Sequence, residues 1–209
     1  MVNSREGQIK RTLLALENNG FVPHFFETAQ AASAWLIDEL KNCNRVGFGG
    51  SVTLRELDVP QQLRELGVET LDHWEGDLSP VEKRRQMLSC FDSDAYCCSA
   101  NALLEQGWIF NSDGRGNRVA ACCFGPEKLY IVAGVNKLVD GVAAAEERLK
   151  KVAGPLNACK NKSETPCAVV GECVDCGSDD RICRVYVLMK RPPRDMQVHV
   201  VIVGEKLGF

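Results

Sequence analysis

The sequence is poor in histidine and lacks long apolar runs and internal repeats. Its three histidines, His24, His73 and His199, lie far apart, and no spacing between them is typical of a pair of metal ligands. The sequence therefore offers no histidine-based catalytic or metal motif. No apolar run approaches the roughly 18 residues that a bilayer span needs, so we expect no transmembrane helix.

An excess of positive charge is also missing. The 209 residues carry 25 Lys and Arg against 28 Asp and Glu, a formal net charge of −3, with no stripe of basic residues. This balance argues against a protein that binds nucleic acid or a membrane surface. The first ten residues lack the apolar core of a signal peptide, so we expect a cytoplasmic chain. In that compartment the eleven cysteines are more typical of buried thiols or metal ligands than of disulfides.

The alternation of helical and strand-like segments predicts an α/β fold. Helical spacing of apolar residues covers the first 18 residues, the segment after Thr28 and the segment from Pro80 to about Cys90, and short apolar runs predict strands at 46–48 and 94–99. This order is typical of a parallel sheet. Three further strand-like runs follow one another through short turns, which favours antiparallel hairpins. They are residues 108–110, 119–124 and 129–133.

The end of the chain has a different composition. We expect Asp140 to cap a helix over residues 142–152, and a polar, cysteine-rich stretch to follow Pro155. Two strand-like runs, 185–189 and 198–203, close the chain. The composition therefore divides the sequence into an α/β core (1–158), a cysteine-rich loop (159–184) and C-terminal strands that pack back on the core (185–209).

A glycine turn after the strand at 46–48 is the first candidate ligand site. Gly49 and Gly50 are followed by Ser51 and Thr53, and then by a helix-compatible segment. Glycines allow a sharp turn and a close approach of a ligand to the backbone. Ser51 or Thr53 can cap the helix, beside N–H groups that favour phosphate or carboxylate. The alternative is an ordinary strand-to-helix turn.

Two later clusters support the ligand interpretation. Arginines beside a glycine-rich turn suit carboxylate or phosphate recognition, because a guanidinium donates two parallel hydrogen bonds. A lysine that directly follows a strand is expected at the carboxyl edge of the sheet, where open α/β sheets bind ligands. The candidates are Asp113, Arg115, Asn117 and Arg118 in the first cluster and Asn136 and Lys137 in the second. Asp113 and Asn117 also suit an ordinary turn, and Lys137 a solvated surface position.

Several blocks in one order resemble a known family, the lactate-utilization (LUD) domain. They are Gly49-Gly-Ser-Val-Thr-Leu-Arg-Glu56, Asn101-Ala-Leu-Leu-Glu-Gln-Gly107, Asp113-Gly-Arg-Gly-Asn-Arg118, Phe124-Gly-Pro126 and Val135-Asn-Lys137. The resemblance implies a fold like that of ribose-phosphate isomerase and CoA-transferase: a three-layer α/β fold with a mainly parallel sheet, some antiparallel hairpins and, here, a cysteine-rich C-terminal element. It places the family's ligand loop at Gly49 to Thr53. Some members belong to bacterial systems that oxidise L-lactate alongside iron–sulfur subunits.

Four cysteines within 17 residues form a candidate metal site. Cys167, Cys173, Cys176 and Cys183 lie among Gly, Pro and Asp, in a stretch too polar to form its own core. Four thiolates on one ion or cluster would hold such a loop together. One closely spaced pair suits zinc, whereas an iron–sulfur cluster tolerates more varied spacing. Unligated or redox-active thiols are the alternative, and the sequence indicates no nucleotide cofactor.

These features support two main hypotheses of function. In the first, the protein is an accessory or electron-transfer-associated component of lactate-type oxidation that binds a small anionic metabolite at the glycine turn. In the second, it is a metal-independent enzyme of the isomerase or CoA-transferase type on a phosphorylated or acyl substrate, with Glu56 or Asp113 as acid/base or nucleophile. A binding protein without chemistry is a third hypothesis. The substrate and the oligomeric state do not follow from the sequence.

Overall fold

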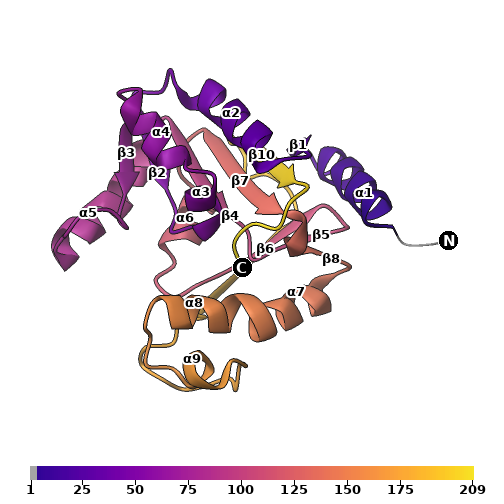
Figure 1. Ribbon diagram of the computed structural model, residues 1–209, viewed down its shortest axis with the longest axis vertical. Helices are drawn as coiled ribbons and strands as arrows, with labels where there is room; N and C mark the ends of the chain where they lie inside the picture. Colours follow the sequence, from indigo (N-terminus) through magenta and orange to yellow (C-terminus); the bar gives the residue numbers. More distant parts are fainter. Residues whose placement is uncertain (1–3) are drawn as a thin grey trace.

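A computed structural model describes residues 4–209 as an α/β structure (Figure 1). The helices are α1 Arg5–Asn18, α2 Ala29–Leu40, α3 Val52–Glu56, α4 Val59–Glu65, α5 Pro80–Ser89, α6 Asn117–Cys123, α7 Val142–Arg148, α8 Gly154–Lys160 and α9 Pro166–Val170. The strands are β1 Val22–Phe26, β2 Arg45–Phe48, β3 Glu69–Asp72, β4 Ala95–Ser99, β5 Ala102–Leu104, β6 Trp108–Asp113, β7 Lys128–Gly134, β8 Leu138–Val139, β9 Val185–Met189 and β10 Gln197–Val203.

The large sheet has six strands in the order β1-β10-β7-β4-β2-β3, and every neighbouring pair is parallel. The predicted three-layer α/β fold with a mainly parallel sheet is confirmed. The C-terminal strand β10 lies between β1 and β7, inside this sheet. Its pairing with β1 brings together His24 and His199, whose ring nitrogens lie 3.0 Å apart.

Helices cover one face of the large sheet, and a mixed layer covers the other. Apolar side chains of α2, α3 and α4, such as Leu36, Leu54 and Leu63, form one core with the sheet. On the opposite face the sheet packs against α1, α6 and a smaller sheet. Because both faces are covered, the strands are apolar along most of their length, as parallel sheets require.

The smaller sheet has four strands in the order β8-β5-β6-β9. β5 pairs with β6, and β6 with β9, in antiparallel fashion, so antiparallel strands exist as predicted. The prediction that residues 129–133 belong to an antiparallel hairpin is wrong, because β7 pairs in parallel with β10 and β4 in the large sheet. Its outer face packs against Ala145 of α7 and against Leu149, which directly follows α7. In Figure 1, α7, α8 and α9 (orange) lie on one side of the large sheet, and the C-terminal end of the chain lies between them and the sheet.

Local capping explains where several helices begin. The hydroxyl of Thr28 accepts a hydrogen bond from the Ala31 N–H at the start of α2. Ser79 and Glu82 form a capping box at the start of α5, and Pro80 occupies its first turn. Such caps satisfy N–H groups that have no partner within the helix. These helix starts agree with the sequence prediction.

The prediction of a strand at residues 119–124 is wrong. Residues 117–123 form the helix α6, which connects β6 to β7. Val119 and Cys122 are buried while Ala120 and Cys123 are exposed, a helical rather than an alternating pattern. The Asp113 carboxylate accepts a hydrogen bond from the Val119 N–H, which holds the first turn of this helix. Cys123 is therefore an exposed thiol on a helix rather than a residue of a strand.

The helix predicted to begin at Asp140 and to end before Pro155 also differs. Gly141, not Asp140, is the N-cap, and the helix continues beyond Pro155 to Lys160. A π-helical segment, Leu149–Ala153, joins α7 to α8 just before Pro155. The π turn accommodates the missing N–H of proline without ending the helix.

Candidate functional site

After the neighbouring parallel strands β2 and β4, the chain continues toward opposite edges of the large sheet. β2 continues to β3 on one side, whereas β4 continues through the small sheet to β7 on the other. Such a divergence leaves a crevice beside the carboxyl ends of the strands. A cavity of about 1040 Å³ lies there, lined by residues that follow four different strands. Ser51 follows β2, Trp74 follows β3, Ser99 ends β4 and Lys137 follows β7.

The predicted glycine turn forms part of the cavity wall. A Cβ atom on Gly50 would lie 2.5 Å from the Trp74 ring, and one on Gly49 would lie 2.9 Å from the Tyr96 hydroxyl, so close packing requires both glycines. Ser51 is the N-cap of α3 and accepts a hydrogen bond from the Leu54 N–H. Gly50 and Ser51 line the cavity. Since α3 has only five residues, the charge of this corner depends on side chains more than on the helix.

Lys137 is the lysine that lies deepest in the wall. Its side chain is only 3% exposed, and Nζ donates hydrogen bonds of 2.9 Å to both the Thr53 and the Ser99 hydroxyl oxygens. The Ser99 hydroxyl in turn lies 2.6 Å from the Val132 carbonyl oxygen, to which it donates. The three side chains come from α3, β4 and the turn after β7. Lys137 forms no ion pair with any described residue.

The surroundings of Lys137 favour its uncharged form. Burial, together with the nearby guanidinium groups of Arg148 and Arg118, lowers its pKa to about 7, against the opposing effects of Glu56 and Cys98. Arg148 itself donates to two backbone carbonyls, those of Asn136 (3.1 Å) and Asn101 (2.6 Å). Three basic groups therefore meet near the inner end of the cavity, and the amine of Lys137 exists in both protonation states near neutral pH.

Asp113 and Arg118 form a buried ion pair beside the cavity. Arg118 Nη2 lies 2.8 Å from Asp113 Oδ1, with the side chains 12% and 8% exposed. Arg118 also donates to the Ser99 and Ser112 carbonyls and to the Asn101 side chain. Both oxygens of Asp113 accept hydrogen bonds within the protein. This pairing gives Asp113 a structural role and leaves its part as an acid/base group a prediction.

The other predicted residues of the Asp113 cluster lie at the cavity surface. Arg115 is exposed and Asn117 is half-buried, and both line the cavity. Arg115 forms no ion pair within residues 4–209. Three further basic side chains of the lining, Lys83, Arg84 and Lys162, share this property. Unpaired cations around a cavity favour an anionic occupant.

Asn136 and Glu56 hold the C-terminal segment. The Asn136 amide donates to the Leu207 and Gly208 carbonyls, and Glu56 accepts from the Gly208 N–H at 2.7 Å. Gly208 has φ +57°, and a Cβ atom on it would lie 2.5 Å from the Thr53 hydroxyl and 3.2 Å from Lys137 Nζ. The segment therefore covers one side of Lys137. Neither Asn136 nor Glu56 lines the cavity. The ligand-binding role predicted for Asn136 and the catalytic role predicted for Glu56 therefore stay predictions.

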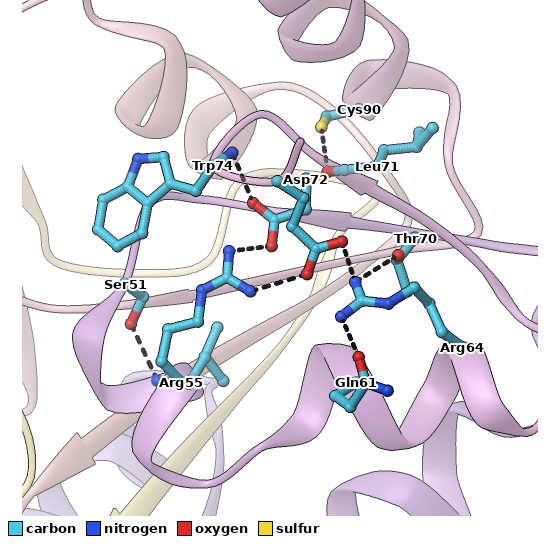
Figure 2. Close-up of polar contacts among 11 residues, drawn as sticks. Ser51, Arg55, Gln61, Arg64, Thr70, Leu71, Asp72, Trp74 and Cys90 are labelled. Atoms are coloured by element: carbon cyan, nitrogen blue, oxygen red, sulfur yellow. Dashed lines mark hydrogen bonds and ion pairs between the residues drawn. The ribbon is translucent and has the colours of Figure 1, made fainter. Parts of the chain in front are cut away.

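A polar network fixes the loop that carries His73 and Trp74. Asp72 accepts a 3.0 Å hydrogen bond from the Trp74 N–H and a contact from Arg55, as Figure 2 shows. Glu75 accepts from Arg55 and Arg64, which completes the network. His73 Nδ1 is buried without a hydrogen-bond partner within residues 4–209, and His73 lines the cavity. The network therefore fixes His73 and Trp74 at the cavity wall.

The cysteine loop (residues 159–184) forms the opposite wall. Residues 179–182 and Arg184 line the cavity, and Asn161 to Ser163 extend the wall from the end of α8. Arg181 holds the loop by donating to the Cys183 and Cys176 carbonyls and to Asp175. These contacts join residues close in sequence.

The four predicted metal ligands do not converge in this arrangement. Cys167, Cys173, Cys176 and Cys183 are all half-buried free thiols. Within residues 4–209, no three His, Cys, Asp or Glu side chains form a group that could hold a metal ion. A shared iron–sulfur cluster or zinc ion would require the loop to rearrange, so thiol ligation stays a prediction.

Three residues of the site carry no clear signal in the sequence. Arg148 lies in the middle of an amphipathic helix, where charge usually indicates a solvated face. Trp74 lies in an irregular segment, and Ser99 is one small residue at the end of a buried strand. Of these, Ser99 was the most accessible to prediction, because it ends a strand of the parallel sheet as Lys137 follows one.

Comparison with known proteins agrees with the fold and the sequence blocks. The LUD domain profile matches residues 9–203, nearly the whole chain. The chain belongs to the LUD domain family. This LUD domain is also similar to a solved structure, the crystal structure of a DUF162 family protein from Deinococcus radiodurans, with a TM-score of 0.58 and 15% sequence identity. The similarity covers 96% of this chain and 98% of the other and shows the shared fold.

Two further findings add no relative and no membrane-spanning helix among the described residues. No curated protein matches this LUD domain. Within residues 4–209, no helix is both long and apolar enough to cross a membrane.

Proposed function

We propose that this LUD domain binds a small anionic metabolite in the cavity at the carboxyl edge of its large sheet. The observation that carries the proposal is the charge of the lining, which contains eight Lys and Arg residues but only three Asp. The whole chain, in contrast, has a net charge of −3. Basic groups gathered around one cavity repel each other, and a carboxylate or phosphate relieves that repulsion.

The metabolic context of this binding follows from the family resemblance. We propose a role in organic-acid oxidation of the lactate type, as an accessory component beside iron–sulfur redox subunits. The family membership and an anion site large enough for a carboxylic acid support this role. The second candidate is a metal-independent enzyme of the isomerase or CoA-transferase type. Lys137 favours it, because a buried amine with a pKa near 7 suits proton transfer.

Anion-dependent thermal stability tests the binding proposal. Phosphate, sulfate and glycolate should each raise the Tm above that in chloride at the same ionic strength, because a ligand at 100 times its Kd stabilises the native state by about 2.7 kcal/mol. Arg115→Ala should reduce the rise, since it removes an unpaired cation from the lining. Arg194→Ala, at an exposed arginine outside the lining, is the matched control. An equal response to chloride and to every anion would contradict the proposal.

A further inference from the structure

The amine of Lys137 is placed to do more than attract an anion. A lysine that only neutralises charge normally faces a carboxylate, but Lys137 Nζ contacts two hydroxyl oxygens at 2.9 Å and no carboxylate among the described residues. Its side chain is almost completely buried, yet it lines the cavity. A desolvated lysine in a cavity with other cationic groups nearby is the arrangement that makes an amine nucleophilic.

We propose that Lys137 binds its ligand covalently, by forming an imine with a carboxylate-bearing aldehyde or ketone of the 2-oxo acid class. This inference rests on the proposed anion binding and names the ligand class for the same cavity. The basic lining would hold the carboxylate, and Nζ would meet the adjacent carbonyl carbon.

The chemistry of this step balances without an oxidant or a metal. The lone pair of Nζ forms a bond to the carbonyl carbon, and the carbonyl oxygen takes a proton to give a carbinolamine. The carbinolamine hydroxyl then leaves as water with the one hydrogen that remains on the nitrogen, and a carbon–nitrogen double bond is left. Hydrolysis reverses the sequence, so no other reactant is needed.

The two hydroxyls differ in their capacity to move these protons. The Ser99 proton is committed to the Val132 carbonyl oxygen at 2.6 Å, so Ser99 can only accept from Lys137. Among residues 4–209, the Thr53 hydroxyl has a single carbonyl acceptor, that of Leu207, at the long distance of 3.5 Å. Its proton is therefore available to the amine nitrogen and to the departing oxygen. Thr53 is the proton relay in this arrangement, and Ser99 orients the amine.

Reductive trapping on the wild-type protein tests the inference directly. The protein is incubated with glyoxylate, the smallest 2-oxo acid, and treated with borohydride, which converts an imine into a stable secondary amine. Intact mass and peptide mapping should find one carboxymethyl group on Lys137. Lys160, whose pKa burial lowers to about 8, is an internal control, because its Nζ lies 3.0 Å above the Trp74 ring. It should stay unmodified.

Glycolate separates this inference from the proposed binding. It has the same carboxylate and a hydroxyl in place of the carbonyl, so it should stabilise the protein and compete with trapping without forming an adduct. Stabilisation by glycolate without a glyoxylate adduct on Lys137 would overturn the covalent step and leave the anion site standing. Loss of both responses would overturn both proposals.

Variants test the assigned roles. Lys137→Met should abolish the adduct, and Thr53→Val should slow trapping by about tenfold or more, since proton transfer contributes at least that much in many active sites. Thr53→Ser keeps the hydroxyl and should restore the trapping rate. This pair of Thr53 variants tests the proton relay independently of whether Lys137→Met folds. Adducts only on exposed lysines such as Lys162, or an unchanged rate in Thr53→Val, would contradict the assignment.

Discussion

The carboxyl edge of the large sheet and the cysteine loop face the same cavity but are held together differently. At the edge, buried polar groups from distant segments satisfy one another, as Lys137 does with Thr53 and Ser99. In the loop, Arg181 bonds to groups within six residues, and Glu164 bonds to Asp180 and Ser178 of the same loop. Backbone hydrogen bonds from Cys173 to Lys150 and from Arg184 to Asp113 join the loop to the rest of the protein, but most of its side chains are exposed or half-buried. The edge is therefore fixed by the whole fold, whereas the loop has the features of low local stability. We infer that the edge supplies the rigid part of the site and the loop its adaptable wall.

Two ion pairs allow the sharpest test of this difference. Asp113→Ala should destabilise the protein by about 3–5 kcal/mol, because it leaves the Arg118 guanidinium buried without its counterion. Asp175→Ala removes the partner of Arg181 in the loop, where the carboxylate is 81% exposed, and should change stability by less than about 1 kcal/mol. Urea unfolding of both variants measures this difference. Similar losses would remove the distinction between the two regions.

Lys137→Met should change the pH dependence of stability. The folded protein lowers the pKa of Lys137 from 10.5 to about 7, so between these values the unfolded chain binds a proton that the folded protein does not. Wild-type stability therefore gains with rising pH, and the Tm of the wild type relative to the variant should increase by roughly 10 °C from about pH 7 to about pH 10.

Burial is the main cause of the lowered pKa, and the neighbouring groups that modify it, Arg148, Arg118, Glu56 and Cys98, are all retained in the variant. Lys162→Met, at an exposed lysine of the cavity rim, is the control and should show no such trend. A pH-independent difference between the wild type and Lys137→Met would contradict the buried, near-neutral amine.

Lys160→Met tests the contact between α8 and the loop after β3. The ammonium lies over the Trp74 ring, and its loss should lower the free energy of unfolding by about 0.5–1 kcal/mol. Lys150→Met, at an exposed lysine, is the control. A change no larger than that of the control would show that this cation–π contact does not help to hold α8 against the cavity.

The smallest expected effect is that of the cysteine loop on the anion-dependent rise in Tm. Cys173→Ser with Cys176→Ser should abolish metal binding, measured as iron and zinc content in anaerobically prepared protein. The same variant should keep the anion-dependent rise in Tm, because the basic side chains of the lining remain. Unchanged metal content would refute ligation by these thiols. A lost anion response would show that the loop, like the edge, determines binding.

The parts of the fold that sequence could predict are those with local causes. Thr28 and Ser79 begin helices through their own hydroxyl groups, and β2, β4 and β7 are short apolar runs. Lys137 could be placed because it directly follows a strand of a parallel sheet. The assignment of residues 119–124 to a strand failed because a short apolar run does not distinguish a buried strand from a short helix such as α6.

The rest of the site depends on tertiary structure. The charge of Arg148 acts on Lys137 only because α7 packs on the small sheet, and the C-terminal segment covers Thr53 only because Asn136 and Glu56 hold it. No spacing in the sequence indicates that Arg148 lies near Lys137 or that the C-terminal segment covers Thr53. The burial of Lys137, and hence its lowered pKa, could not be inferred from its neighbours in the chain.

The most direct test of the site is the titration of Lys137 itself. NMR of protein labelled at the lysine side chains, with Lys137→Met to assign the signal, gives the pKa of the amine with and without phosphate. We predict a pKa near 7 in the free protein and an upward shift when the anion binds, since a nearby negative charge favours the ammonium form. A pKa near the ordinary lysine value of 10.5, unchanged by phosphate, would contradict a desolvated amine in an anion-binding cavity.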